Sequence, residues 1–302
     1  MRNWKDMIEA GFANGKLLCL GLDPDWKKIP KHLKSDTIAQ TDVVVDFCKK
    51  IVDATAHLVL AYKPNIAFFA RRGARGIEGL RRLVAYINAV APHAVVILDS
   101  KRGDIGNSMA GYVEEAFVEI GAHAMTANPY LGQDACQPLL NEKDHGAVFL
   151  CKTSNPGSGE FQNARMLIDD PEEEKFLAEF GTVSYLLGQH PMVELYQHVA
   201  YRVSRHWNDN GNCALVVGAT YPAELQSIRR IVGNMPILIP GIGTQGGDEE
   251  ATIAAGRDDR NRGMIINVGS AILYASAGED YVEAAVAKAE YYSARFLNLA
   301  NA

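Results

Sequence analysis

An apolar run that begins at Ala94 and ends at Leu98 is followed at once by closely spaced charges, at Asp99, Lys101 and Asp104. Side chains of a strand point to the same face at every second residue, so Asp99 and Lys101 are expected to project together from the end of a buried strand. The stretch is therefore interpreted as a buried strand that carries two opposite charges, fixed side by side, to its own C-terminal end, where chemistry can take place.

Asp104 lies beyond that strand end, after a turn opened by Gly103, so its carboxylate need not face the same pocket as the other two charges. A second interpretation stays open for this stretch. The charges can form a salt-bridged strand end, with Asp104 as the acidic residue at the N-terminus of the next helix.

Composition limits the kinds of function that fit. The chain has 302 residues, 48% of them hydrophobic, which is enough for one large core or two small ones. A net charge of −6 with scattered basic residues argues against nucleic-acid and membrane-surface binding. Five cysteines without a Cys-x-x-Cys pair argue against a disulfide framework and a zinc site. The charged N-terminus lacks a signal-peptide core, and no run is long enough to span a membrane. A cytoplasmic protein with a small substrate is expected.

Eight apolar, β-branched segments recur along the chain, and amphipathic helical stretches such as Asp36 to Ala56 and Gly76 to Ala91 lie between them. Strict alternation of strand and helix predicts a parallel sheet, and eight repeats predict an α/β fold that is a closed (β/α)₈ TIM barrel. The eight segments are Leu17 to Asp23, Leu58 to Lys63, the stretch from Ala94, Ala124 to Asn128, Ala147 to Ser154, Ala214 to Thr220, Ile237 to Gly243 and Met264 to Gly269.

One connection is longer than a crossover helix needs. About sixty residues separate the fifth segment from the sixth, and Val193 to Trp207 can supply the crossover helix. The remaining residues, about 155–192, are expected to form an extended loop or lid on the top face of the barrel. The chain is therefore predicted to be a single domain over residues 1–302.

The carboxyl ends of the strands build the active site in barrels of this kind. Three of the predicted strand ends carry ionisable groups that would point into one mouth, among them Lys63 at the second and Asp99 with Lys101 at the third. Glycines follow the seventh and eighth segments, where barrels commonly bind phosphate through backbone N–H groups. A phosphorylated small molecule is the expected substrate.

The order of these motifs resembles that of the orotidine 5′-monophosphate decarboxylase family, in particular its longer bacterial subgroup. The resemblance extends from about Leu17 to Tyr274. It rests on Gly21-Leu22-Asp23-Pro24, Lys63-Pro64-Asn65, Asp99-x-Lys101-x-x-Asp104-Ile105, Lys152-Thr153-Ser154-Asn155-Pro156, Val217-Gly218-Ala219-Thr220-Tyr221-Pro222 and the run from Pro240 to Gly247.

The resemblance implies decarboxylation of orotidine 5′-monophosphate to UMP, the last step of de novo pyrimidine synthesis, without a metal or organic cofactor. It implies a homodimer with shared sites, in which Asp104 and Ser108 reach the neighbouring subunit. It also implies roles for particular residues. The catalytic residues are Lys63, Asp99, Lys101 and Asp104, and the substrate-binding residues are Asp23 and Ser108 at the ribose, Ser154 at the pyrimidine, Gln245 at the phosphate, and Ile105, Pro240, Gly269 and Ser270.

One departure concerns the phosphate. Members of the family usually carry an arginine just after the eighth strand, where this chain has Ser270. The arginines at 257, 260 and 262 precede that strand and are expected at the opposite face. Gln245, the backbone N–H groups near Gly243 and Gly269, and Arg165 in the long insertion are left as candidate phosphate donors.

Two other functions stay open at this point. A magnesium-dependent sugar-phosphate decarboxylase or aldolase of the same suprafamily would share the charged strand end. Such an enzyme needs a carboxylate pair around its metal, and Lys63 fits that poorly. A non-catalytic nucleotide-binding barrel is the other alternative.

Overall fold

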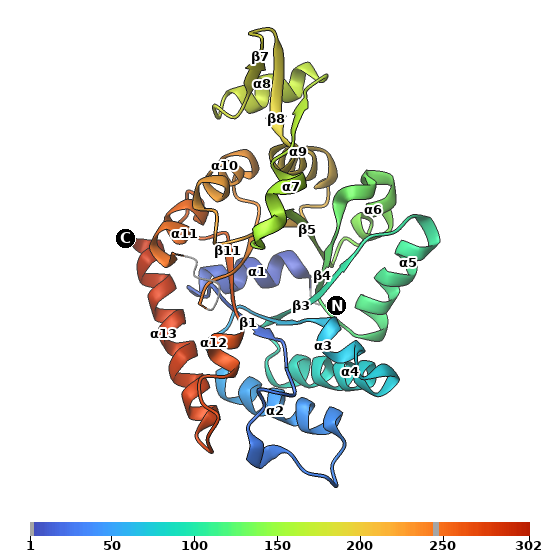
Figure 1. Cartoon of the computed structure of the whole chain (residues 1–302), viewed down its shortest axis with the longest axis vertical. Helices are drawn as coiled ribbons and strands as arrows, with labels where there is room; N and C mark the ends of the chain where they lie inside the picture. Colours follow the sequence, from blue (N-terminus) through green and yellow to red (C-terminus); the bar gives the residue numbers. More distant parts are fainter. Residues whose placement is uncertain (1–2, 244–247) are drawn as a thin grey trace.

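The computed structural model describes residues 3–243 and 248–302 and contains a closed barrel of eight parallel strands (Figure 1). Around the barrel the strands follow the order β1-β2-β3-β4-β5-β9-β10-β11, so sequence neighbours pair throughout. This confirms the predicted TIM barrel. The strands are β1 (Leu18–Leu22), β2 (Ala61–Pro64), β3 (Val95–Arg102), β4 (Ala124–Ala127), β5 (Gly146–Lys152), β9 (Cys213–Val217), β10 (Ile237–Pro240) and β11 (Met264–Val268).

Helices cover the outside of the barrel and connect consecutive strands (Figure 1). Their spacing of apolar residues places one buried face against the sheet. The helix expected from Asp36 begins at Gln40, after the cap residue Ala39. The helices are α1 (Trp4–Ala13), α2 (Gln40–Thr55), α3 (Ile66–Ala70), α4 (Gly73–Val90), α5 (Gly106–Glu114), α6 (Gln133–Leu140), α7 (Gly159–Gln162), α8 (Pro171–Ala178), α9 (Leu195–Arg202), α10 (Pro222–Val232), α11 (Glu249–Gly256), α12 (Ser270–Leu273) and α13 (Tyr281–Asn301), with short 3₁₀ or π turns at η1 (Lys31–Leu33), η2 (Glu115–Glu119), η3 (Pro129–Leu131), η4 (Pro156–Ser158) and η5 (Val203–Trp207).

The barrel strands are apolar because both of their faces are covered, one by helices and one by the barrel interior. All five residues of β1 and of β9 are buried. In β3 the first five residues are buried, and the last three emerge from the core. The strand therefore brings its polar end to the mouth of the barrel.

Helix α1 covers the opposite end of the barrel. Trp4 is almost fully buried and packs against the first residue of β5, Gly146, where an added Cβ would lie 2.5 Å from the indole. Gly11, also in α1, lies even closer to Leu60, just before β2, and leaves no room for a Cβ there. Both contacts involve the amino ends of strands, so α1 leaves the carboxyl ends free for a site.

The insertion follows β5 as predicted, but it is a small sheet with helices rather than an extended loop. Its strands β6 (Arg165–Leu167), β8 (His190–Glu194) and β7 (Ser184–Leu186) pair antiparallel in the order β6-β8-β7. Most of it, with α8, projects from the barrel at the top of Figure 1. Strand β8 leads directly into α9, where Glu194 and Gln197 form a capping box.

None of the helices in the described ranges is both long enough and apolar enough to cross a membrane.

Candidate active site

Asp99 lies at the centre of a charged cluster at the mouth of the barrel. Its Oδ2 accepts a hydrogen bond from Lys63 Nζ at 2.9 Å, and its Oδ1 accepts one from Lys101 Nζ at 2.5 Å. Lys63 and Asp99 are buried, whereas the Lys101 side chain is 48% exposed. One carboxylate thus holds two ammonium groups, of which only the Lys101 group is open to a molecule entering the mouth.

Thr126 on β4 orients the cluster from the next strand. Its hydroxyl donates to Asp99 Oδ1 at 3.0 Å and accepts from the backbone N–H groups of Ser100 and Lys101. Asn65 adds a weaker contact at 3.4 Å to Asp99 Oδ2. The carboxylate is therefore fixed from β2, β3 and β4 together.

The backbone at Lys101 differs from the expected regular strand. Its φ is +47°, and the pairing of β3 with β4 shifts register between Leu98 and Arg102. Lys101 meets Asp99 as predicted, but not through simple strand alternation. A left-handed backbone at a residue other than glycine costs free energy and is concentrated at functional sites.

The cluster holds its charges over a wide pH range. Burial alone would raise the pKa of Asp99, but Lys63 and Lys101 outweigh it and hold that pKa well below its usual range. Burial alone would lower the pKa of Lys63, but Asp99 and Asp23 raise it above its usual value. Asp99 is therefore an anion and Lys63 a cation near neutral pH.

Asp23, just after β1, has a buried carboxylate oxygen, Oδ1, without a hydrogen-bond partner among the described residues. Burial raises the pKa of this carboxyl. The Tyr274 hydroxyl donates to the Asp23 carbonyl at 2.9 Å and so fixes the backbone beside it. Since buried polar atoms normally have partners, the free oxygen marks a place for a donor from a ligand.

The residues after β3 do not join this cluster within the described chain. Asp104 is half-exposed, and its Oδ1 accepts only from the neighbouring Ile105 N–H. Helix α5 begins at Gly106 with no acid in its first turn, so Asp104 is not the helix-terminal acid of the alternative interpretation. Ile105 and Ser108 are exposed.

The other predicted substrate-binding residues lie at strand ends of the same face. Ser154 follows β5, Pro240 ends β10, and Gly269 and Ser270 lie at the start of α12. The ends of β1 and β11 approach closely, because a Cβ on Gly21 would lie 3.2 Å from Gly269 Cα. Gln245 lies outside the described residues.

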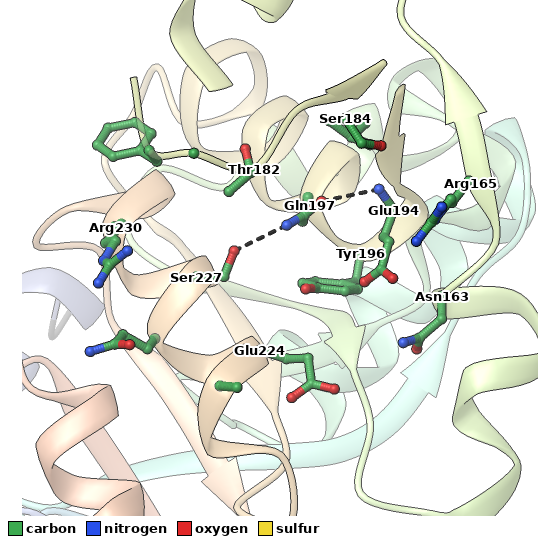
Figure 2. Close-up of a pocket in the computed structure, with 15 residues that line it drawn as sticks. Asn163, Arg165, Thr182, Ser184, Glu194, Tyr196, Gln197, Glu224, Ser227 and Arg230 are labelled. Carbon is green, nitrogen blue, oxygen red and sulfur yellow. Dashed lines mark hydrogen bonds between the residues drawn. The ribbon is translucent and has the colours of Figure 1, made fainter. Parts of the chain in front are cut away.

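Arg165 lies elsewhere. It is on β6 and lines a cavity of about 460 Å³ between the insertion, α9 and α10, with Arg230 on the opposite side (Figure 2). Neither the charged cluster nor Ser270 lines this cavity. Two of the arginines before β11, Arg260 and Arg262, form ion pairs with Glu9 of α1, which places them at the amino end of the barrel as predicted.

Three contributions were not predicted from sequence. Thr126 was a detectable candidate, because it is a polar residue inside an otherwise apolar strand. Tyr274 gave no local signal, since it contacts Asp23 across 251 positions. Lys152 ends β5, and its ammonium bonds to Ser158 and Asn163 rather than to the carboxylate of Asp99. In the described ranges no three His, Cys, Asp or Glu side chains are grouped to hold a metal ion.

Comparisons with known proteins give a consistent result. Residues 16–179 match the model of the orotidine 5′-phosphate decarboxylase / HUMPS family. An orotidine 5′-phosphate decarboxylase of Janthinobacterium sp. (strain Marseille) is 46% identical over 89% of this chain and 88% of its own. One from Azoarcus sp. (strain BH72) is 46% identical over 90% of each chain. The structure of Leishmania donovani OMP decarboxylase superposes with a TM-score of 0.75, at 32% identity over 97% of this chain and 98% of its own.

Proposed function

The chain belongs to the orotidine 5′-phosphate decarboxylase family, and we propose that Lys63, Asp99 and Lys101 form its catalytic centre. The enzyme removes CO₂ from orotidine 5′-phosphate and leaves UMP. The observation that carries the assignment of the centre is the single carboxylate of Asp99 held between two ammonium groups, one buried and one open to the mouth.

Asp99 acts on the bound substrate as a fixed negative charge. It lies beside the substrate carboxylate, and two like charges about 4 Å apart repel by roughly 1 to 4 kcal/mol at effective dielectric constants between 80 and 20. The repulsion disappears as CO₂ leaves. Because Lys63 and Lys101 lower the pKa of Asp99, the residue cannot relieve the repulsion by taking up a proton near neutral pH.

Lys101 supplies the opposite interaction. When the bond between C6 and the carboxyl carbon breaks, its electron pair stays on C6, and the ammonium of Lys101 stabilises that carbanion and then transfers a proton to it. The attraction is stronger in the transition state than in the ground state, so it accelerates the reaction. The half-exposed position of the side chain supports this role.

The remaining contacts hold the substrate. The free Oδ1 of Asp23 accepts a hydrogen bond from a ribose hydroxyl, and Lys63 assists at the same sugar. Ser154 contacts the pyrimidine ring. The phosphate is bound by the loops that follow β10 and β11, which contain Pro240, Gln245, Gly269 and Ser270, and contacts far from C6 fix the geometry of the reacting atoms.

The site is completed by a second subunit. Asp104, Ile105 and Ser108 make no contact with the charged cluster of their own chain in the described residues, and we assign them to the site of the partner in a homodimer. Exposed apolar side chains support an interface here, since Ile105 is 63% exposed and Tyr130, on the turn after β4, is 81% exposed.

We place the enzyme in the cytoplasm, in keeping with five free and buried cysteines.

The test is the loss of orotate ultraviolet absorbance when purified protein is mixed with orotidine 5′-monophosphate in the presence of EDTA. Turnover that survives the chelator supports the proposal. Binding of UMP without turnover would identify a non-catalytic nucleotide-binding barrel, and turnover that requires added magnesium would favour the metal-dependent relatives.

A further inference from the structure

Lys152, the last residue of β5, is a buried cation whose partners in the described ranges are all neutral. Its side chain is almost completely enclosed, at 1% exposure. The ammonium donates to Asn163 Oδ1 at 2.5 Å and to Ser158 Oγ at 3.2 Å, and it lies 4.5 Å from the centre of the Tyr221 ring. Enclosing an ammonium group without a carboxylate is unfavourable, so a purely structural role would be served better by an apolar side chain.

The contacts of Lys152 come from two sides. Ser158 and Asn163 flank α7 at the beginning of the insertion, whereas Tyr221 lies in the loop between β9 and α10. Charge-assisted hydrogen bonds are roughly twice as strong as neutral ones, and both they and a cation–π contact depend on the direction of approach. Lys152 therefore ties the insertion and the β9 loop to the end of β5.

The segment from Thr153 to Asn155 is held between these two sides. On the insertion side, the Thr153 N–H donates to Gln162 Oε1 at 2.9 Å. On the β9 side, the Thr220 hydroxyl donates to the Ser154 carbonyl at 3.3 Å, and the Tyr221 hydroxyl donates to the Asn155 carbonyl at 3.4 Å. Ser154 thus has a fixed position that depends on the residues Lys152 joins.

We propose that Lys152 is a positioning residue that sets the place of Ser154 and thereby the recognition of the pyrimidine ring. The inference rests on the proposed function, in which Ser154 contacts that ring. It gives the insertion a part in substrate specificity, because Ser158 and Asn163 belong to it.

The experiment compares two ligands that differ in the pyrimidine. Lys152→Met keeps the length of the side chain and removes its charge. We expect the affinity for UMP to fall about tenfold, the size of one lost hydrogen bond, while the affinity for ribose 5-phosphate, measured in parallel by calorimetry, stays unchanged. We expect kcat/KM for orotidine 5′-monophosphate to fall by about 10- to 100-fold, as misplacement of a substrate contact does.

A double-mutant cycle tests whether the effect passes through Ser154. Ser154→Ala should weaken UMP binding in the wild type and have little further effect in Lys152→Met. Asn163→Leu, which removes the partner instead of the cation, should reproduce the selective loss and serves as the test if Lys152→Met fails to fold. Asn163→Asp keeps an acceptor for the ammonium and should retain UMP affinity.

Equal weakening of UMP and ribose 5-phosphate, or additive effects in the cycle, would overturn the proposal and leave Lys152 a support of the fold. Unchanged UMP binding in both Lys152→Met and Asn163→Leu would overturn it as well. Failure of the proposed function can be told apart from failure of this proposal. The first would appear as an absence of turnover in the wild type, whereas the comparison of UMP with ribose 5-phosphate does not depend on turnover.

Discussion

Asp99 is the residue on which the charged cluster depends, because it is the carboxylate that both lysines contact. Without it, Lys63 would be a buried ammonium group beside the second ammonium group of Lys101. The negative charge of Asp99 thus offsets the repulsion between the two ammonium groups. Removing that charge is expected to destabilise the fold.

Asp99→Asn is therefore expected to lower the free energy of unfolding by about 3 kcal/mol near pH 7, the cost of leaving a buried charge unpaired. The pKa of Asp99 is depressed in the folded protein, so the contribution of its charge is complete above the unfolded-state pKa of about 3.9 and is lost as the pH falls further toward the folded-state pKa. Urea unfolding of the wild type and of Asp99→Asn, from neutral pH into acid, checks this. The difference between their free energies of unfolding should stay constant and shrink only in strong acid. Asp209→Asn, a change at an exposed carboxylate outside the site, is the control and should have little effect.

Lys101→Ala removes both the carbanion-stabilising charge and the proton donor. Since each effect contributes at least about a hundredfold, we expect kcat to fall by roughly 10⁴-fold or more. The affinity for UMP, in which the proton is already in place, should change much less. Near-normal turnover in the variant would contradict the assignment of Lys101, and Lys175→Ala, an exposed lysine of α8, controls for the loss of charge.

The phosphate contacts can be ranked at the same scale. Arg165 lines the cavity of the insertion together with Arg230 (Figure 2), and Ser270 is not part of its lining. Arg165→Ala should therefore leave KM nearly unchanged. Gln245→Ala should raise KM about tenfold, as expected for one lost hydrogen bond.

Ser270→Arg should lower KM, because charge-assisted hydrogen bonds are roughly twice as strong as neutral ones. A larger effect from Arg165→Ala than from Gln245→Ala in steady-state kinetics would instead identify the insertion as a phosphate-binding lid.

Among the elements, the barrel strands were predictable because each one carries its own signal. The run from Ala94 to Leu98 is apolar, and burial on both faces of a parallel strand requires that composition. The sequence therefore located β3 and brought Asp99 and Lys101 together. The left-handed backbone at Lys101 was not predictable, because the Lys101 N–H donates to the Thr126 hydroxyl on another strand and no local pattern in the sequence indicates that contact.

The sheet of the insertion was also harder to predict, because it depends on contacts between segments that are separate in the sequence. Strands β6 and β7 have three residues each, and they are held by pairing with β8 rather than by an apolar pattern of their own. Lys152 likewise resembles another charged strand end in sequence. Only the fold shows that its partners are Asn163 and Tyr221, which lie in two separate loops.

Gly218, just after β9, allows the segment after β5 to pass close to the end of β9. A Cβ at this position would lie 2.7 Å from Ser154 Cα and 2.8 Å from its backbone nitrogen. Gly218→Ala should therefore displace Ser154, destabilise the fold by about 1–3 kcal/mol and raise KM. Gly157→Ala is the matched control, since the nearest atom to its Cβ is a side-chain nitrogen at 3.8 Å. Thermal unfolding and steady-state kinetics should be measured on both variants. Equal stability and equal KM in the two would contradict the claim that a Cβ at position 218 displaces Ser154.

At the scale of the whole molecule, we propose that the insertion and the barrel form one domain. The insertion packs through α8 onto α9, where Phe176 contacts the Tyr201 ring and His198 lies 2.6 Å from the buried Glu173. Helix α9 in turn packs on β5, since the Cys151 thiol donates to the Tyr196 carbonyl. The insertion is thus connected to the barrel through a continuous set of contacts.

The dimer gives the last prediction. In a two-fold dimer whose sites combine residues of both chains, Lys101→Ala and Asp104→Ala homodimers should each be inactive. A hybrid dimer has one site with both defects and one with neither. Equal amounts of the two variants after subunit exchange should recover about a quarter of wild-type activity, because half of the dimers are hybrids with one intact site each. Exchange is verified by mass spectrometry with one variant isotope-labelled. No recovery after verified exchange would mean that Asp104 acts within its own chain, which would require the loop after β3 to fold back toward Asp99.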